Sequence, residues 1–186
     1  MKSHRLLLIG LGLGVLVTLA ATGCFITSGQ VFAHFALPNP FTIDSSTDPF
    51  ERVLVDLNTI KDYADHKDKL KGLADVAVIG KFTNVAGPAG GVEVWITPDE
   101  TDYTTIGEVQ AGATKLWGPG TIGAAGSVHT VTWAESAKLF NSAGKTILIN
   151  ESKGDGVFTI YTHGTMGTYD IRVDGGEIVL VLSAGL

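Results

Sequence analysis

The sequence predicts a mainly β protein: an antiparallel β-sandwich with two short helices, preceded by an N-terminal signal helix. Two observations support this fold class. From residue 50 onward, short segments rich in β-branched and aromatic residues recur, separated by turns rich in Gly, Pro and Asp. No alternation of strands and helices of the parallel type is visible. Many short strands joined by turns are typical of a sandwich or barrel.

The first three expected strands have the clearest pattern. Valines alternate with other residues over 51–57, which predicts a strand. The segments 75–83 and 92–97 are rich in β-branched and aromatic residues. The Gly- and Pro-rich run 86–91 between them predicts a hairpin with a long loop.

Six more strands are expected after residue 113. Asp174-Gly175-Gly176 separates the last two and predicts a hairpin turn, because glycine adopts the positive φ that such turns need. The six expected strands cover residues 114–117, 127–133, 146–149, 157–162, 168–173 and 178–183.

Two segments depart from the strand pattern and predict helices. The first covers 58–73, where Asn58 can cap a helix and Gly72 can end it. The second covers 134–140 and ends at Asn141. We expect both helices to cover open ends or edges of the sandwich, since covered edges do not pair with other chains.

The N-terminus has the pattern of a secretory signal. Lys2 and Arg5 precede an apolar run over 6–21, which is shorter than the roughly 20 residues of a membrane-spanning helix. The following residues end in Thr22-Gly23-Cys24, and Cys24 is the only cysteine of the chain. The run Leu-Ala-Ala-Thr-Gly-Cys resembles the lipobox of bacterial lipoproteins. In that family the signal, here 1–23, is removed and the cysteine carries a covalent lipid.

The resemblance implies a protein of the cell envelope, attached to a bacterial membrane through a lipid on Cys24. Two or more acyl chains hold a protein stably on a bilayer, whereas one holds it only marginally. In lipoproteins of Gram-negative bacteria, a residue other than Asp after the cysteine, here Phe25, implies the outer membrane. Removal of the signal leaves 11 basic and 19 acidic residues, a net charge of −8. This balance argues against a nucleic-acid partner.

The mature chain is expected to have two parts. Prolines and the polar run 44–48 predict that 24–49 is a lipid-anchored tether, and 50–186 is the sandwich domain. Val31 to Leu37 is apolar enough to be an edge strand docked on the body. The alternatives are that this segment lies near the lipid surface or packs on another protein.

The body loosely resembles immunoglobulin-like sandwich domains. The resemblance lies in the run from Ala77 to Asn84, which continues into a Gly- and Pro-rich turn and a paired strand. Many sandwiches share this pattern, so it assigns no functional residue.

Two acidic clusters are candidate metal sites. Asp62 and His66 are four residues apart on an expected helix and so share a face. Asp99 and Asp102 lie in an expected turn, where carboxylates can bind calcium. Interleaved lysines favour a solvated, ion-paired surface for the first cluster, and acidic turns are common. A calcium- or zinc-dependent ligand-binding protein is therefore an alternative function.

The sequence contains no complete catalytic motif. It has neither a Gly-x-Ser-x-Gly nucleophile elbow nor a His-Glu-x-x-His metal motif. Ser127 and His129 are two apart in an expected strand, and His163 is another candidate base. We therefore expect no enzymatic activity, with an envelope hydrolase built on Ser127 or His163 as a second alternative.

Trp95 and Tyr103 are the candidate binding residues. Trp95 alternates with Val94 and Ile96, so it points outward if these two point inward. It is the tryptophan that we expect to be exposed. Trp and Tyr are enriched at binding surfaces. The sequence thus predicts a lipid-anchored binding or structural module whose partner is an envelope protein or a glycan.

Overall fold

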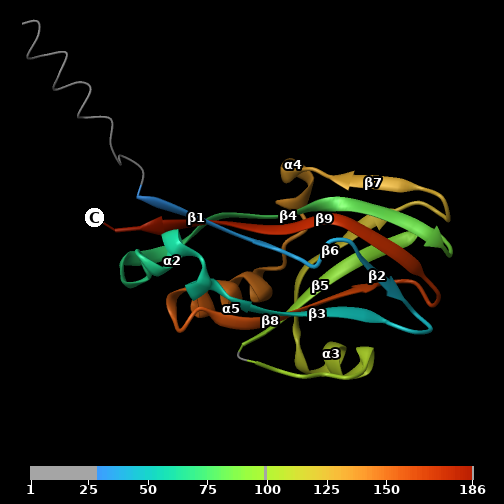
Figure 1. Ribbon diagram of the computed structural model, residues 1–186, viewed down its shortest axis with the longest axis horizontal. Coiled ribbons are helices and arrows are strands. Elements are labelled where there is room, and N and C mark those ends of the chain that lie inside the picture. Colours follow the sequence, from blue (N-terminus) through green and yellow to red (C-terminus); the bar gives the residue numbers. More distant parts are fainter. Residues whose placement is uncertain (1–28, 99, 186) are drawn as a thin grey trace, which may run out of the picture.

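The computed structural model describes residues 29–98 and 100–185. Two antiparallel sheets pack face to face and form a β-sandwich, which confirms the predicted fold class (Figure 1). The five-stranded sheet contains β1 (Gln30–Ala36), β9 (Asp170–Ala184), β4 (Leu70–Ala86) and β7 (Val128–Val131) in that order, with β2 (Phe41–Asp44) also paired to β9. The four-stranded sheet has the order β3 (Phe50–Asp56), β8 (Val157–Gly164), β5 (Gly90–Pro98) and β6 (Thr114–Ile122).

Helical segments occupy the connections between strands. They are η1 (Leu57–Thr59), α2 (Lys61–Ala64), η2 (Lys67–Lys69), α3 (Ile106–Gly112), α4 (Trp133–Ser136) and α5 (Ser142–Lys153). Two short helices are expected from the sequence, whereas the described residues form four α-helices. Among the described residues, no helix has the length and apolar character needed to cross a bilayer.

The core lies between the two sheets and follows the alternation of the strands. On β5, Val92, Val94 and Ile96 are almost fully buried in the core. On β8, Phe158 and Ile160 face the same core. Burial of alternate side chains leaves the intervening residues on the outer face of the four-stranded sheet.

The predicted helix over 58–73 is wrong in extent. The segment forms three short helical turns, and β4 already begins at Leu70. Leu70 pairs with Ala184 of β9, so sheet pairing replaces the last turn of the expected helix. Tyr63 is fully buried and donates a hydrogen bond to the Ser152 carbonyl, which holds the middle turn on the body.

The predicted strand over 146–149 is wrong, because these residues lie in α5. Asn141 caps the helix by accepting a hydrogen bond from the Ala143 N–H at 2.9 Å. The buried residues of α5 are Gly144, Leu148 and Ser152, which are four apart and so lie on one helical face.

The predicted hairpin turn at Asp174–Gly176 is also wrong. β9 continues from Asp170 to Ala184 without reversing. Gly175 has a φ of 59°, and β4 shows a register shift between Ile79 and Lys81 opposite this point. The glycine therefore forms an irregularity within a long strand pair, a use of positive φ that differs from a hairpin turn.

The body begins near residue 30. β1 pairs with β9 along its whole length, and its Val31 and Ala33 side chains are buried in the core. The predicted edge strand over Val31–Leu37 is thus confirmed, and residues 30–44 belong to the sandwich and not to a tether. The signal segment 1–23 and Cys24 lie outside the described residues.

Replacing Glu51 with Gln is expected to raise the melting temperature at pH 7. Burial raises the pKa of the half-buried Glu51, and the nearby Asp48 carboxylate raises it further. A raised folded-state pKa means that Glu51 contributes stability at acidic pH, and that this contribution is lost as the pH rises through the folded-state pKa. The difference between Glu51→Gln and wild type should therefore disappear below about pH 4.5, the ordinary pKa of Glu.

Thermal unfolding followed by circular dichroism across this pH range tests the Glu51 prediction. Asp48→Asn is the matched comparison, because it removes the repulsion and leaves Glu51 half-buried, so its increase should be smaller. A lower melting temperature of Glu51→Gln at pH 7 would contradict the prediction.

Candidate functional site

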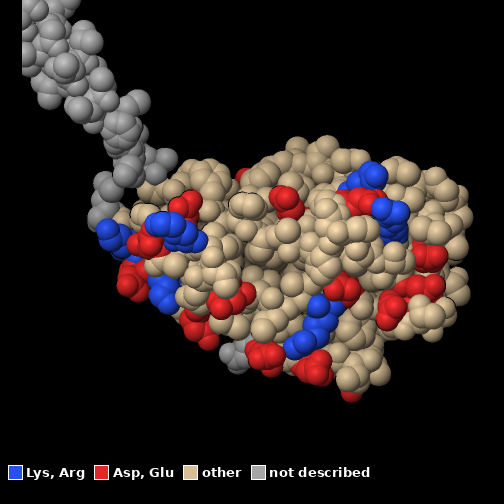
Figure 2. Space-filling view, in the orientation of Figure 1, with Lys and Arg blue, Asp and Glu red and all other residues tan. Residues whose placement is uncertain are grey.

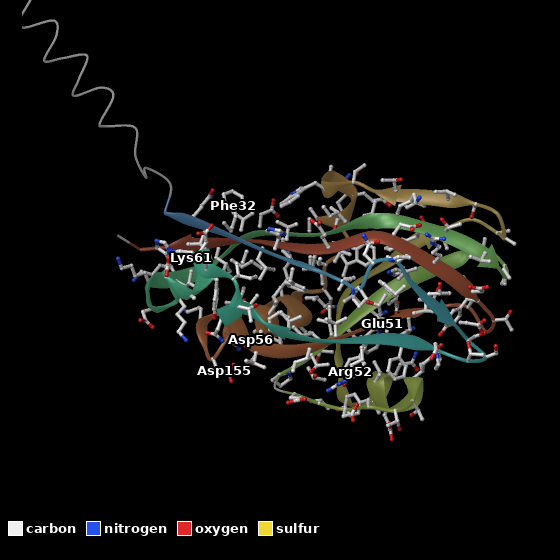
Figure 3. The ribbon with its side chains drawn as sticks, viewed as in Figure 1. Phe32, Glu51, Arg52, Asp56, Lys61 and Asp155 are labelled. Atoms are coloured by element: carbon white, nitrogen blue, oxygen red, sulfur yellow. The ribbon has the colours of Figure 1, made fainter. Side chains whose placement is uncertain are left out.

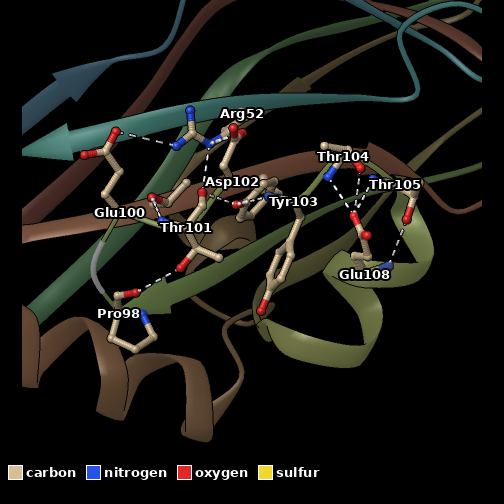
Figure 4. Close-up of polar contacts among 11 residues, drawn as sticks. Arg52, Pro98, Glu100, Thr101, Asp102, Tyr103, Thr104, Thr105 and Glu108 are labelled. Atoms are coloured by element: carbon tan, nitrogen blue, oxygen red, sulfur yellow. Dashed lines mark hydrogen bonds and ion pairs between the residues drawn. The ribbon is translucent and has the colours of Figure 1, made fainter.

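The segment 100–112, which we call the strap, covers the outer face of the four-stranded sheet (Figures 1 and 4). The hydroxyl of Tyr161 on β8 donates a hydrogen bond to the Thr101 carbonyl at 2.5 Å and accepts one from the Tyr103 N–H at 3.3 Å. Arg52 on β3 donates to the same Thr101 carbonyl at 2.8 Å. These contacts fix the first half of the strap on the sheet.

The second half of the strap is α3, whose start is set by a capping box. The Thr105 hydroxyl accepts from the Glu108 N–H at 3.2 Å, and the Glu108 carboxylate accepts from the Thr105 N–H at 3.1 Å (Figure 4). Hydrogen bonds from the N–H and hydroxyl of Thr104 lower the pKa of Glu108. With its first turn fixed, α3 places Ile106 and Gln110, four residues apart, on one helical face.

A cavity of about 400 Å³ opens beside α3. Its walls come from α3, from the ends of β5 and β8, and from the loops that follow β2 and β8. This volume falls in the range of about 300–1,000 Å³ typical of small-molecule sites. Among its lining residues, Glu93 and His163 are buried ionisable groups.

Glu93 and His163 are directly opposite each other on β5 and β8. Their side chains lie on the outer face of the sheet, yet the residues are only 7% and 1% exposed. One Glu93 carboxylate oxygen is 2.5 Å from the Lys115 ammonium group, and the other accepts a hydrogen bond from the Trp95 indole N–H at 3.2 Å. Lys115 also lies over the Trp95 ring, 5.4 Å from its centre.

His163 is held in one orientation. Its Nδ1 is 2.8 Å from the Gly164 carbonyl oxygen, and its ring stacks on Trp95 with 5.9 Å between the ring centres. The other ring nitrogen, Nε2, is buried and has no hydrogen-bond partner among the described residues. A buried polar atom without a partner costs stability, so this nitrogen is a candidate contact for a ligand.

Two hydroxyl side chains of the cavity wall bind backbone groups. Thr165 accepts from the Gly91 N–H at 2.9 Å, and Ser45 accepts from the Tyr169 N–H at 3.1 Å. Burial raises the pKa of Tyr169, whose hydroxyl donates to the Pro49 carbonyl at 2.5 Å. The loops around the cavity are therefore tied to one another.

The structure brings both predicted binding residues to this sheet face. Trp95 points outward, as the alternation predicts, but it is half-buried beside His163. Trp133, at 37% exposed, is the more exposed tryptophan, so the expectation that Trp95 is the exposed one is wrong. Tyr103, in the strap, packs against Tyr161 of β8, with 5.6 Å between their ring centres.

The described candidate metal residues do not form a cluster of metal ligands. Asp62 and His66 line a second cavity of about 360 Å³ beside Phe32, and His66 Nδ1 lies 2.9 Å from the Asp62 backbone carbonyl. Asp102 is paired with Arg52 at 3.5 Å, and Asp99 lies outside the described residues. Within residues 29–98 and 100–185, no three metal-ligating side chains of His, Cys, Asp or Glu gather at one point.

The candidate catalytic residues also lie apart. Ser127 directly precedes β7 in the five-stranded sheet, whereas His163 is on the outer face of the four-stranded sheet. His129 Nε2 is 2.7 Å from the Glu135 carboxylate, which makes a local pair at the edge of the first sheet. The Ser127 and His163 side chains therefore belong to different sites.

Glu93, Lys115 and Gln110 are the site residues that the sequence analysis missed. Glu93 is an acidic residue inside an otherwise apolar strand, in phase with Trp95. That position carries a signal, because charged residues are depleted in strands unless they have a partner. The identity of the partner depends on the pairing of β5 with β6 and is not local.

Lys115→Met is expected to destabilise the protein more than Glu93→Gln. The Glu93 side chain is 9% exposed and that of Lys115 is 33% exposed, so only the lysine can turn to water when its partner is lost. Removing one partner of a buried ion pair leaves the other charge uncompensated, which costs about 3–5 kcal/mol of stability. Because Lys115 is partly exposed, we expect a smaller loss of about 1–2 kcal/mol for Lys115→Met. For Glu93→Gln we expect less than half of that loss.

Urea unfolding of both variants measures these losses. Lys61→Met is the matched control, since Lys61 pairs with Asp65 at the exposed surface and its replacement should change little. Equal losses for Lys115→Met and Glu93→Gln would contradict the proposed asymmetry.

No protein-family model matches this chain, and no curated protein matches it. The cavity, the buried Glu93–His163 pair and the strap are therefore interpreted from the structure of this chain alone.

Proposed function

We propose that the protein is a lipid-anchored binding module of the cell envelope, without enzymatic activity, that holds a small polar ligand in the cavity beside α3. The observation that carries the proposal is the buried pair of Glu93 and His163 at this cavity. Burial of a carboxylate and an imidazole costs free energy, and apolar residues at these two positions would suffice to pack the strap onto the sheet.

The cavity favours binding over nucleophilic catalysis. The hydroxyls of Ser45 and Thr165 each accept a hydrogen bond from a backbone N–H. The Glu93 carboxylate is engaged by Lys115 and Trp95. These groups hold the wall in place, and a concave site with a few placed polar groups is the usual form of a ligand pocket.

The position of the cavity suits a protein anchored through Cys24. Gly29 follows Cys24 by five residues. Because a fully extended chain spans at most about 3.6 Å per residue, Gly29, which directly precedes β1, would lie within about 18 Å of the lipid-bearing residue. An anchor at that distance holds the end of the sandwich that carries α2 and β1 near the bilayer.

The ligand cavity lies toward the other end of the sandwich. Val157 of β8 pairs with Asp56, next to the helical turns that lead to α2, whereas Gly164 at the other end of β8 lines the cavity. A strand of this length extends about 23 Å at about 3.3 Å per residue. Figure 3 shows the same separation: Phe32 and Lys61 lie toward the β1 end, whereas Arg52 lies farther along β3, toward α3.

The face of the body shown in Figure 2 has acidic and basic side chains interleaved, with uncharged surface between them. This face has no continuous patch of positive charge that would hold the body flat on an anionic bilayer. In our proposal the lipid anchor, and not surface charge, attaches the protein to the membrane.

The proposal is tested by expressing the wild type and Cys24→Ala in bacteria that are fed radiolabelled palmitate. We expect the label on the wild type only, and the wild type in the membrane fraction. Cys24→Ala should carry no label. Cys24→Ser, which keeps the size of the side chain, is the matched control and should behave as Cys24→Ala does. An unlabelled wild type in the soluble fraction would refute the anchor.

Ligand binding is tested on the full chain purified from membranes by native mass spectrometry. The expected result is a small molecule that co-purifies with the wild type and is reduced in Gln110→Ala, a substitution of an exposed residue on the cavity rim. Mass spectra of wild type without any adduct, from several growth conditions, would count against the binding module.

A further inference from the structure

We propose that the cavity beside α3 binds an uncharged, hydroxyl-rich ligand, that is, a polyol or a saccharide ring. This inference rests on the proposed binding function and names its ligand class. It follows from the hydrogen-bonding state of His163, the compensated charge of Glu93, and the composition of the cavity wall.

The tautomer of His163 is fixed by its backbone contact. The Gly164 carbonyl oxygen, 2.8 Å from Nδ1, can only accept a hydrogen bond. Nδ1 therefore carries a proton, and in the tautomer with this single ring proton Nε2 presents a lone pair. Since Nε2 is buried without a partner in the described residues, a ligand that meets it has to donate a hydrogen bond.

Glu93 adds acceptor capacity without net charge. A carboxylate has about four lone-pair positions, and two of these face Lys115 and Trp95. The remaining positions can accept hydrogen bonds from a ligand. Because the Lys115 ammonium group lies 2.5 Å from the carboxylate, the pair as a whole is electrically neutral.

The rest of the wall combines polar and apolar groups. Gln110 and Thr165 bring an amide and a hydroxyl, each with both donor and acceptor capacity. Ile106 and Met166 contribute apolar surface. A saccharide ring presents hydroxyls at its edge and C–H groups on its faces, and so matches a wall of this kind.

Charged ligands fit the same wall poorly. An anion would face the Glu93 carboxylate, and no arginine or lysine is among the residues that line the cavity. A cation would have to compete with Lys115 for Glu93. Either charge would lose its hydration without gaining a counter-ion, which is costly.

Three probes with the same sugar scaffold separate these cases: glucose, glucosamine and glucuronate, which are neutral, cationic and anionic at pH 7. Each is titrated into the isotope-labelled full chain in a detergent that contains no sugar, and backbone amide shifts are recorded by NMR. We expect glucose to shift the amides of residues 163–167 and 110 at lower concentration than either charged probe.

His163→Phe is the decisive variant, because it keeps a ring against Trp95 and removes the acceptor nitrogen. Its affinity for glucose should fall about tenfold, the effect of losing one hydrogen bond of about 1.4 kcal/mol. His34→Phe, the same change at an exposed position of β1, should bind as the wild type does. Thr165→Val, at an exposed position on the rim, is the second variant and removes a wall hydroxyl together with its hydrogen bond from the Gly91 N–H.

The outcomes separate this inference from the proposed function. Binding of glucosamine or glucuronate at the cavity in preference to glucose would overturn the ligand class and leave the binding module in place. Glucose shifts that are unchanged in both His163→Phe and Thr165→Val, or that fall outside the cavity, would overturn the assigned site. Absence of binding by all three probes would also overturn the inference, while the native mass spectra test the binding function independently.

Discussion

Trp117→Ala is expected to lower the free energy of unfolding by about 3–5 kcal/mol, the loss typical of removing a large buried aromatic side chain. Trp117 is fully buried and lies on β6 opposite Val94, with its ring directed into the core. Its ring packs edge-on against Phe82 of β4, with 6.2 Å between the ring centres. The side chain thus connects the two sheets of the sandwich.

The indole nitrogen of Trp117 adds a polar connection. It donates to the Ser136 carbonyl at 3.1 Å and to the Ser136 hydroxyl at 3.0 Å, and that hydroxyl accepts from the Val78 N–H at 2.7 Å. One tryptophan therefore fixes α4 and β4 together. Removing it leaves both a cavity and buried polar groups of Ser136 with fewer partners, and each of these costs stability.

Urea unfolding followed by far-ultraviolet circular dichroism measures this loss. Trp117→Phe is the matched comparison: it keeps most of the ring and removes the hydrogen bonds, so its loss should be smaller, about 1–3 kcal/mol. Trp133→Ala, at the most exposed tryptophan, should cost about 1 kcal/mol or less. A loss for Trp117→Ala as small as that for Trp133→Ala would contradict the role given to this side chain.

The strands were the part of the fold most accessible from sequence. In β3, β5 and β8 one face is buried in the core, so side chains alternate and the period of two is visible in the residues themselves. The same reasoning places Trp95 on the outer face. These elements depend on a local pattern that burial imposes.

The elements that the sequence analysis got wrong depend on partners far along the chain. Residues 146–149 have β-branched and apolar character, but Asn141 caps a helix whose buried residues are four apart. Gly175 does adopt a positive φ of 59°, but β4 pairs with β9 on both sides of it, so β9 continues as one strand. Tertiary pairing overrides local preference in both cases.

The candidate site could be predicted only in part. The sequence predicts Trp95 and Tyr103 as binding residues, and both lie on the strap side of the four-stranded sheet. The Glu93–His163 pair joins residues 70 apart in the chain through the register of β5 and β8. The spacing of residues in a single sequence does not predict which residues of β5 and β8 pair, so the cavity can be recognised only in the folded structure.

Gly144→Val is expected to cost about 3 kcal/mol, at the upper end of what overpacking a core position usually costs. Gly144 is buried in the first turn of α5, where the helix crosses β6. A Cβ atom at this position would meet the Lys115 carbonyl oxygen and would lie 2.5 Å from the Leu116 Cα. Both neighbours are backbone atoms of a strand, so they cannot rotate out of the way.

α5 cannot move away from β6 to make room either, because the start of α5 is hydrogen-bonded to β6. The Asn141 N–H donates to the Leu116 carbonyl at 2.9 Å, and Phe140 forms a bridge with Trp117. Added volume at Gly144 must therefore break these contacts or distort β6, which also carries Trp117 and Lys115. The substitution should thus weaken the core and the cavity wall together.

Gly107→Val in α3 is the matched control for Gly144→Val. It makes the same change in the first turn of another helix, where the nearest atom to an added Cβ is 3.9 Å away. Because glycine is a poor helix former, this control should be neutral or slightly stabilising, by up to about 0.5 kcal/mol. Urea unfolding that gives equal changes for the two variants would show that helix propensity, and not the approach of α5 to β6, decides the stability at Gly144.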